Sequence, residues 1–367
     1  MQKTVLAAAL AAASMPALSA ESVTPSNEEL YEIIQAQQEE IDRLVGARKN
    51  VSEGQTTIGG YGEVHYNDLD SGSKIDFHRF VLFFNHAFND KIRFFSELEL
   101  EHSLAGDGKP GEVELEQAYV EYDLSNNTRL KGGLFLVPVG LLNETHEPPT
   151  FYGVERNPIE SAIIPSTWWE AGAAVSGNLG ESGLSYDVGL HSGLAVGDNF
   201  SIRSGRQKVA EAVAEDLAVS GRIKYTGIAG LELAATVLHQ SDITQGLVAG
   251  AGAATLLETH AVWNSGPLTL TALYANWSLD GAAPEALEKD VQDGFYVEGS
   301  WRFNEQFGVF ARHNVWDVGG IGDTEVSQAN VGVNYWPHRN VVVKFDVQDQ
   351  GKAGDNDGFN LGLGYQF

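Results

Sequence analysis

Hydrophobic and polar residues alternate with a period of two along most of the chain from Thr56 onward. Because successive side chains of a strand point to opposite faces, each such segment predicts a strand with one apolar and one polar face. The last segment shows the pattern most clearly. It places one set of residues on the apolar face: Phe359, Leu361, Leu363, Tyr365 and Phe367. Short alternating strands with aromatic ends are typical of barrels embedded in lipid.

The pattern predicts an all-β fold: a 16-stranded antiparallel transmembrane β-barrel with a short N-terminal periplasmic α-helix. No segment is apolar for long enough to form a membrane-spanning helix. The sixteen predicted strands cover residues 56–67, 74–88, 91–103, 111–124, 128–138, 168–178, 183–192, 215–226, 230–240, 254–265, 267–279, 291–303, 306–316, 325–336, 340–349 and 357–367.

The connections between these strands alternate between short and long. Two to three residues separate many pairs, as at Asn89-Asp90 and Ser265-Gly266, whereas the other connections are longer. The longer ones are 68–73, 104–110, 139–167, 193–214, 241–253, 280–290, 317–324 and 350–356. Outer-membrane barrels have short periplasmic turns and long external loops. The short turns therefore predict the periplasmic rim, and an aromatic girdle is expected beside it at Trp301, Phe303, Tyr335, Trp336, Tyr365 and Phe367.

The first 54 residues have a different organisation. Lys3 precedes an apolar run over 5–13, and small residues follow up to Ala20, which is the pattern of a secretory signal peptide over 1–20. Residues 21–54 contain a capping-box pattern at Ser26 and Glu29 and apolar residues at alternating steps of four and three. We expect a periplasmic helical or coiled-coil extension there, and a lone amphipathic helix is the alternative. The transmembrane barrel then covers 55–367.

Composition narrows the range of functions. The formal net charge of −27 makes a basic nucleic-acid-binding surface improbable. The chain has no cysteine, which excludes thiolate catalysis and cysteine-ligated metals. The histidines show no paired metal-ligand spacing in the sequence, so no metal site is predicted. His191 and Ser192 are adjacent and therefore point to opposite faces of a strand, so they do not predict a hydrolase. No cofactor is expected.

Charged residues fall on the faces that would line the barrel interior, where burial in a dry core would be costly. The predicted pore-lining bases are Arg79, Arg93, Arg129, Lys131, Arg222, Lys224, Arg302, Arg312 and Lys344. The predicted pore-lining acids are Glu63, Glu97, Glu99, Glu101, Glu258 and Glu298. The alternation in 111–124 slips near Gln117-Ala118, which suggests a bulge and weakens the inward assignment of Glu112, Glu114 and Glu116. Such a wall favours a water-filled lumen, although ion-paired struts are the alternative role for any one residue.

The segment 139–167 is long for a connection without a strand of its own, and its prolines and aromatics argue against disorder. We expect it to fold inward and narrow the pore, with an external lid as the alternative. The residues expected at the constriction are Glu144, His146, Glu147, Glu155 and Arg156. The segment 193–214 contains Arg203, Arg206 and Lys208 and is expected to be a second, basic loop at the mouth.

Two blocks of sequence resemble one known family. Residues 112–121 (EVELEQAYVE) and the block from Asn143 to Glu160 look like the phosphate-selective porin O and P family. The resemblance implies a trimeric sixteen-stranded outer-membrane porin whose third external loop enters each channel. Phosphate-selective members use a ladder of arginines, whereas here the inward bases alternate with glutamates.

These observations predict a passive outer-membrane porin of a Gram-negative bacterium, surrounded by lipid, that passes small hydrophilic solutes and ions. The acid-rich wall favours weak cation preference or no selectivity, and an anion- or phosphate-selective porin is the alternative within channels. A barrel-borne enzyme or an adhesin is the alternative outside them.

Overall fold

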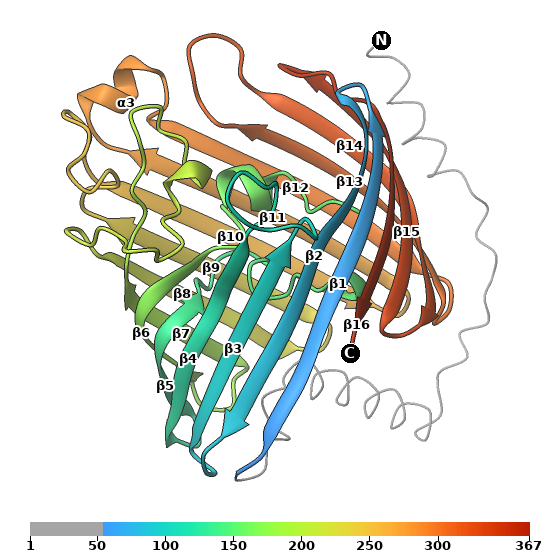
Figure 1. The fold of residues 1–367 in the computed structure, drawn as a ribbon, viewed down its shortest axis with the longest axis horizontal. Coiled ribbons are helices and arrows are strands. Elements are labelled where there is room, and N and C mark those ends of the chain that lie inside the picture. The colour runs from blue at the N-terminus through green and yellow to red at the C-terminus, as the bar shows by residue number, and fades with distance from the viewer. Residues whose placement is uncertain (1–53) are drawn as a thin grey trace. The chain divides into compact units, whose positions relative to one another are not determined.

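The alternating segments form the wall of a closed barrel in the computed structural model, which describes residues 54–367. Every strand pairs antiparallel with its neighbours in the chain, and β1 pairs with β16 to close the ring (Figure 1). The strands are β1 (Thr56–Leu69), β2 (Gly72–Ala87), β3 (Ile92–Glu101), β4 (Val113–Ser125), β5 (Thr128–Leu136), β6 (Trp169–Asn178), β7 (Leu184–His191), β8 (Ala218–Ile228), β9 (Leu231–Gln240), β10 (Ala254–Ser265), β11 (Leu268–Leu279), β12 (Val291–Arg302), β13 (Phe307–Asp317), β14 (Val326–His338), β15 (Val341–Lys352) and β16 (Gly358–Gln366). The predicted fold class is confirmed.

The remaining elements are short and lie in the connections. They are η2 (Pro148–Thr150), η3 (Ile159–Ile163), η4 (Arg203–Gly205) and α3 (Ala282–Ala286). None of the helices in residues 54–367 has the length and apolarity needed to cross a bilayer. The predicted signal peptide (1–20) and all but the last residue of the predicted helical extension (21–54) lie outside the described residues.

Main-chain hydrogen bonds close the barrel. Gly60 and Phe367 exchange two of them, with N···O distances of 3.0 and 2.8 Å. Gly60 also lies so close to β2 that a Cβ atom there would be 2.2 Å from the carbonyl oxygen of Val81. Glycine is therefore required at this position by the close approach of two neighbouring backbones.

Two details of the wall differ from the sequence prediction. The connection 68–73, predicted to be one of the longer ones, is a two-residue turn between Leu69 and Gly72, because β1 and β2 both extend further than their alternation indicates. Trp336, expected in the aromatic girdle, is buried inside, where its indole N–H donates to the carbonyl of Pro149 at 3.4 Å. The register of β14 against β15 shifts between Tyr335 and His338, and this shift breaks the alternation.

The bulge predicted in β4 is confirmed, since the pairing shifts where Glu97 and Leu98 face Gln117 and Leu115.

The inner face is not polar all the way round, contrary to the simplest reading of the alternation. A sector of the wall formed by β8 to β12 carries buried apolar side chains that include Leu238, Leu256, Leu273 and Trp277. Two long connections fold inward and cover this sector, and the green ribbon inside the ring of strands in Figure 1 shows the first of them. We call this apolar region the dry sector. Removing its side chains from water favours the inward position of both connections.

The dry sector includes buried residues of both connections. The connection between β5 and β6, residues 137–168, contributes Val137, Val139, Ile159, Ile163, Ile164 and Trp168. The connection between β7 and β8, residues 192–217, contributes Leu194, Val196, Phe200 and Ile202. The second connection, expected to be a basic loop at the mouth, buries its apolar residues against the wall, while its Lys208 pairs with the exposed Glu112 just before β4.

We predict that Trp277→Ala lowers the free energy of unfolding by about 3–5 kcal/mol, because it leaves a large void in the dry sector. It also removes the hydrogen bond from the indole N–H to the carbonyl of Ile163, 2.9 Å long. Denaturant unfolding of the refolded barrel in micelles measures the change. Trp263→Ala is the matched control, since Trp263 is 46% exposed on the outer surface. Equal losses for both variants would contradict the importance of the dry sector.

Candidate functional site: the constriction inside the barrel

The connection 137–168 is fixed in the lumen at its own base by a buried carboxylate. Glu160 accepts hydrogen bonds from the backbone N–H groups of Leu141 and Leu142, both at 2.6 Å. It also accepts from the side chain of Asn157 at 2.9 Å and from the hydroxyl of Tyr296 on β12 at 3.2 Å. Burial raises the pKa of Glu160. This carboxyl ties the start of the connection to its η3 turn and to the wall.

The middle of the same connection is attached to the opposite part of the wall. Lys344 on β15 donates to the carbonyl of Gly153 at 2.8 Å, and the N–H of Val154 donates to Asp346 at 2.8 Å. Pro148 lies against Gly364 of β16, where a Cβ atom would be 2.2 Å from the proline ring. The connection therefore contacts inward-facing residues of β12, β15 and β16.

The residues expected at the constriction differ in their contacts with the wall. Glu144 pairs with Arg222 on β8, and Glu155 accepts hydrogen bonds from Asn67 at 2.9 Å and contacts His65 at 3.1 Å. Glu147 is half-buried and precedes the η2 turn. The side chain of Glu155 is 43% exposed although it lies within the barrel, which indicates water in this part of the lumen.

His146 lies between two buried glutamates of the wall. Its Nε2 atom is 3.5 Å from Glu97 on β3 and 3.6 Å from Glu116 on β4. Burial disfavours the charged ring, but the two carboxylates outweigh it and raise the pKa of His146 to about 10. His146 is therefore a cation at neutral pH and attaches the connection to the β3–β4 wall.

Glu144 and Glu155 remain ionised because groups of opposite charge lie beside them, as they do beside His146. Burial opposes their ionisation, but Arg222 and Lys131 lower the pKa of Glu144 to about 2. Hydrogen bonding and charge from His65 lower the pKa of Glu155 to about 2 as well. Both carboxylates are thus compensated negative charges.

The predicted pore-lining bases all occur on inward-facing strand positions, and most have a partner. Arg79 pairs with Glu63 at 2.8 Å, Arg93 with Glu121 at 3.0 Å, and Arg312 with Glu298 at 3.3 Å. Arg222 also contacts Asp187, and Lys224 contacts Glu232.

Three of the predicted bases lie over aromatic rings: Lys131 over Phe135, Arg302 over Trp336 and Lys344 over Phe151. Arg129 is half-buried near the short-turn rim.

The predicted acids form a denser group than the sequence indicates. Glu97, Glu99 and Glu101 of β3 face Glu112, Glu114 and Glu116 across the β3–β4 pair, and we call these six residues the glutamate ladder. Glu114 and Glu116 point inward on one side of the bulge in β4 and Tyr119 and Glu121 on the other, so the predicted bulge leaves the glutamates inside. Glu258 lies elsewhere, 2.7 Å from His260 on β10.

Basic residues of the connection 192–217 lie near the same region. Lys208 pairs with Glu112 at 2.6 Å and with Glu114. Arg203 donates to the carbonyls of Ser161 at 3.1 Å and Ser166 at 2.6 Å, and Arg206 donates to that of Thr167 at 2.5 Å. These arginines hold the two connections together. The sequence shows that the three residues are basic. Their position depends on the groups that they contact in the folded chain, which the sequence does not reveal.

A cavity of about 140 Å³ lies between the connections and the wall. Arg79, Arg156 and Arg203 line it, with Glu63, Glu155, two histidines and two serines. Among residues 54–367 no carboxylate is within 4.0 Å of the Arg156 or Arg203 guanidinium, and one terminal nitrogen of Arg156 has no hydrogen-bond partner. Burial and the nearby Arg79 lower the pKa of Arg156, and burial with Arg206 and Arg156 lowers that of Arg203 to about 10. The cavity thus contains cations that repel one another.

The adjacent His191 and Ser192 do not form a catalytic pair. The ring of His191 contacts the hydroxyl of Ser220 at 3.2 Å, whereas the Ser192 hydroxyl donates to Glu170. The two side chains have separate structural partners.

The sequence profile of the family described as phosphate-selective porin O and P matches residues 55–367. The chain belongs to this family. This porin is also 30% identical over 351 residues to an uncharacterised protein of Aquifex aeolicus. The matched region covers 85% of this chain and 80% of the relative. The family resemblance inferred from residues 112–121 and 143–160 is therefore confirmed.

Solved structures share the fold of this porin. The channel DcaP of Acinetobacter baumannii has a TM-score of 0.61 at 14% identity, over 86% of this chain and 98% of that one. An anion-selective porin from Comamonas acidovorans has a TM-score of 0.59 at 13% identity, over 86% and 100%. OmpT of Vibrio cholerae, solved in a trimer form, has a TM-score of 0.57 at 12% identity, over 86% and 100%. The protein is an outer-membrane porin.

We predict that His146→Gln destabilises this porin most at low pH. The pKa of His146 is about 10 in the folded state against 6.5 for the free side chain. A raised folded-state pKa gives stability that is fully present below pH 6.5 and is lost as the pH rises through about 10. The difference in unfolding free energy between wild type and variant should therefore shrink from pH 6 to pH 10, as measured by denaturant titration. A constant difference would show that the ring acts only by packing.

Proposed function

We propose that this porin is anion-preferring and that small oxyanions, phosphate among them, pass through the constriction by diffusion. The observation that carries the proposal is the cavity lined by Arg79, Arg156 and Arg203, in which two guanidinium groups have no carboxylate partner within ion-pair distance in the part of the chain that the structure describes. Like charges held close together raise the free energy of the empty site, and an anion relieves that repulsion.

The cavity has the groups that a small oxyanion requires. Guanidinium groups bind phosphate and carboxylate with two parallel hydrogen bonds, and serine hydroxyls donate a further bond. Ser161 and Ser166 line the cavity, and the Ser166 hydroxyl has no hydrogen-bond partner among the described residues. A volume of about 140 Å³ has room for about four waters, which suits an ion of phosphate size.

Net charge argues for the alternative, weak cation preference, which the sequence favoured. The specific observation on its side is the glutamate ladder, whose six carboxyls share one part of the wall. His146, Lys208 and Arg79, however, lie against the ladder and offset much of its charge. Selectivity is set at the narrowest part of a channel and not by the total charge of its loops, so we give the cavity more weight.

We further propose that the porin is a homotrimer in the outer membrane and is exported by the signal peptide over 1–20. The family assignment and the trimer form of OmpT support the assembly. In this proposal Glu144, His146, Glu147, Glu155 and Arg156 form the constriction, and the inward bases and acids described above line the path to it.

We predict an anion-selective reversal potential for the wild-type channel in a planar bilayer under a salt gradient. Arg156→Gln should shift it toward cations by a factor of about three in permeability ratio, because one charge at about 6 Å in water is worth about 0.7 kcal/mol. Arg129→Gln, which removes a charge near the short-turn rim, is the control and should shift it less. A cation-selective wild-type channel would overturn the proposal in favour of its alternative.

We also predict that phosphate reduces the chloride current through the wild-type channel at concentrations where sulfonate buffers do not. The reason is bidentate binding to guanidinium groups in the cavity. Arg156→Gln should raise the half-blocking phosphate concentration several-fold. If phosphate leaves the chloride current unchanged in the wild type, the channel selects by charge alone and has no oxyanion site.

A further inference from the structure

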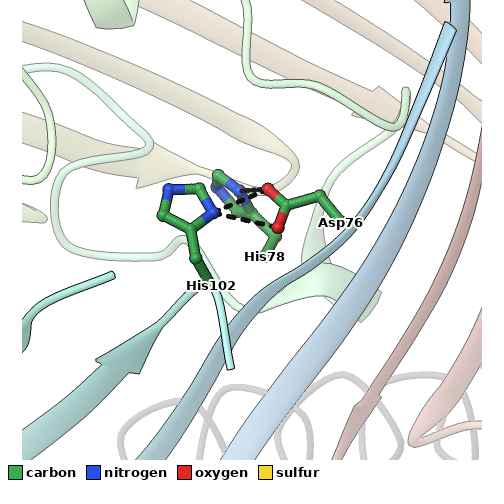
Figure 2. A group of neighbouring side chains, drawn as sticks. All are labelled: Asp76, His78 and His102. Atoms are coloured by element: carbon green, nitrogen blue, oxygen red, sulfur yellow. Dashed lines mark hydrogen bonds and ion pairs between the residues drawn. The ribbon is translucent and has the colours of Figure 1, made fainter. Parts of the chain in front are cut away.

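Two histidines and an aspartate converge near the long-loop end of the wall. Neither the family assignment nor the proposed selectivity gives them a role, although His78 also lines the cavity that contains Arg79 and Arg156. Asp76 and His78 lie on β2, and His102 is the first residue after β3 (Figure 2). The pairing of β2 with β1 shifts between Arg79 and Asp76, so strict alternation is broken there, and His78 lies on the same side as Asp76 with its Nδ1 atom 3.4 Å from Oδ2. Figure 2 shows both imidazole rings pointing toward the Asp76 carboxylate.

The backbone fixes where these three side chains meet. The N–H of His102 donates to the carbonyl of His78 at 3.1 Å, which continues the β2–β3 pairing beyond Arg79 and Glu101. His102 then adopts a φ of +52°, uncommon for a residue with a side chain. The ring of His102 consequently meets that of His78 edge to face, with centroids 5.8 Å apart.

The three ligand atoms lie within 4.8 Å of one another, and the two distances that involve Asp76 are close to the spacing of a tetrahedral metal site. Nδ1 of His78 is 3.4 Å from Oδ2 of Asp76, and Nδ1 of His102 is 2.8 Å from the same oxygen. Ligands about 2.0–2.1 Å from a zinc ion in a tetrahedron are about 3.3 Å apart. His78 already has that spacing, and His102 needs a shift of about half an ångström once an ion replaces the N–H···O hydrogen bond.

Neighbouring groups hold His78 in position without competing for the ion. The ring of His65 stacks on that of His78 with centroids 4.8 Å apart and an interplanar angle of 15°. Both nitrogens of His65 are engaged, one with Glu63 at 3.0 Å and the other with Glu155 at 3.1 Å. Glu63, together with Glu99, also counters the charge of Arg79, which is next to His78 in the chain. Such support orients a metal-binding ring.

The site is open to water. The side chains of Asp76, His78 and His102 are 16%, 28% and 31% exposed, so an ion can reach them from solution. Three ligands leave one position of a tetrahedron free for water or another small ligand. Two imidazoles and one carboxylate suit zinc, copper, nickel and cobalt better than magnesium or calcium, which prefer oxygen.

We propose that Asp76, His78 and His102 bind one divalent transition-metal ion of the zinc class on the inner wall of the barrel. The ion would link the connection after β3 to β2 and add positive charge beside the cavity that contains Arg79 and Arg156. The inference is independent of whether the channel prefers anions.

Calorimetric titration of the untagged, refolded porin with Zn²⁺ tests the proposal. We expect one ion per chain for the wild type, no heat of binding with Mg²⁺, and at least tenfold weaker zinc binding for His102→Gln and for Asp76→Asn. His338→Gln, which alters a histidine near the short-turn rim, is the matched control and should bind zinc as the wild type does. Unchanged zinc affinity in both site variants would overturn the proposal.

A second measurement requires no variant. Co²⁺ substitutes for Zn²⁺ and gives intense visible absorption only in tetrahedral or five-coordinate sites. We expect the folded wild-type porin to develop such absorption with one equivalent of Co²⁺ and to lose it when Zn²⁺ is added. A spectrum identical to that of Co²⁺ in water would exclude a site built by protein ligands. Either result is independent of conductance, so failure of the metal site does not affect the proposed channel function.

Discussion

Burial of apolar side chains inside the barrel is the interaction on which the rest of the constriction depends. A barrel of sixteen strands is wide enough to contain water, so nothing in the wall alone narrows it. Here Ile163, Trp168 and Phe200 of two long connections pack against Leu256 and Trp277 of the wall. The hydrophobic effect is non-directional, and it brings the connections inward without specifying their charges. The polar contacts of Glu160, His146 and Lys344 then determine where each charged group lies.

The electrostatics of the interior follow from that packing. Once the connections are inside, most inward charges meet a partner of opposite sign from another part of the chain, as Arg222 does with Glu144 and Lys208 with Glu114. Removing either member of such a pair would leave an uncompensated charge in a confined space. Arg156 and Arg203 are different because they lie next to other cations and to backbone carbonyls. The interior is thus largely neutralised, with its surplus of positive charge concentrated at one place.

The strands could be predicted from the sequence because alternation is a local property of each segment. The predictions were wrong where strand pairing overrides the alternation. This happened in the β1–β2 turn and at Trp336, whose orientation depends on a register shift. The dry sector was missed for a different reason. Alternation separates the two faces of a strand, but it does not show which apolar residues face inward. Leu256 and Leu273 could not be told from the apolar residues of the outer face. The loop 139–167 was recognisable by length and composition. Its individual partners, and the meeting of His102 with Asp76, depend on contacts between segments that are distant or unpaired in the sequence.

The one-sided position of the dry sector affects what a travelling solute encounters. Strands β8 to β12 are covered by apolar packing over part of their inner surface, whereas the polar cavity lies against β1 and β2. The circumference set by strand number therefore overstates the aperture. In the proposed channel the dry sector is a scaffold, and the wall beside the polar cavity contacts the solute. Substitutions in these two regions should accordingly follow different rules, with side-chain volume conserved in the first and charge in the second.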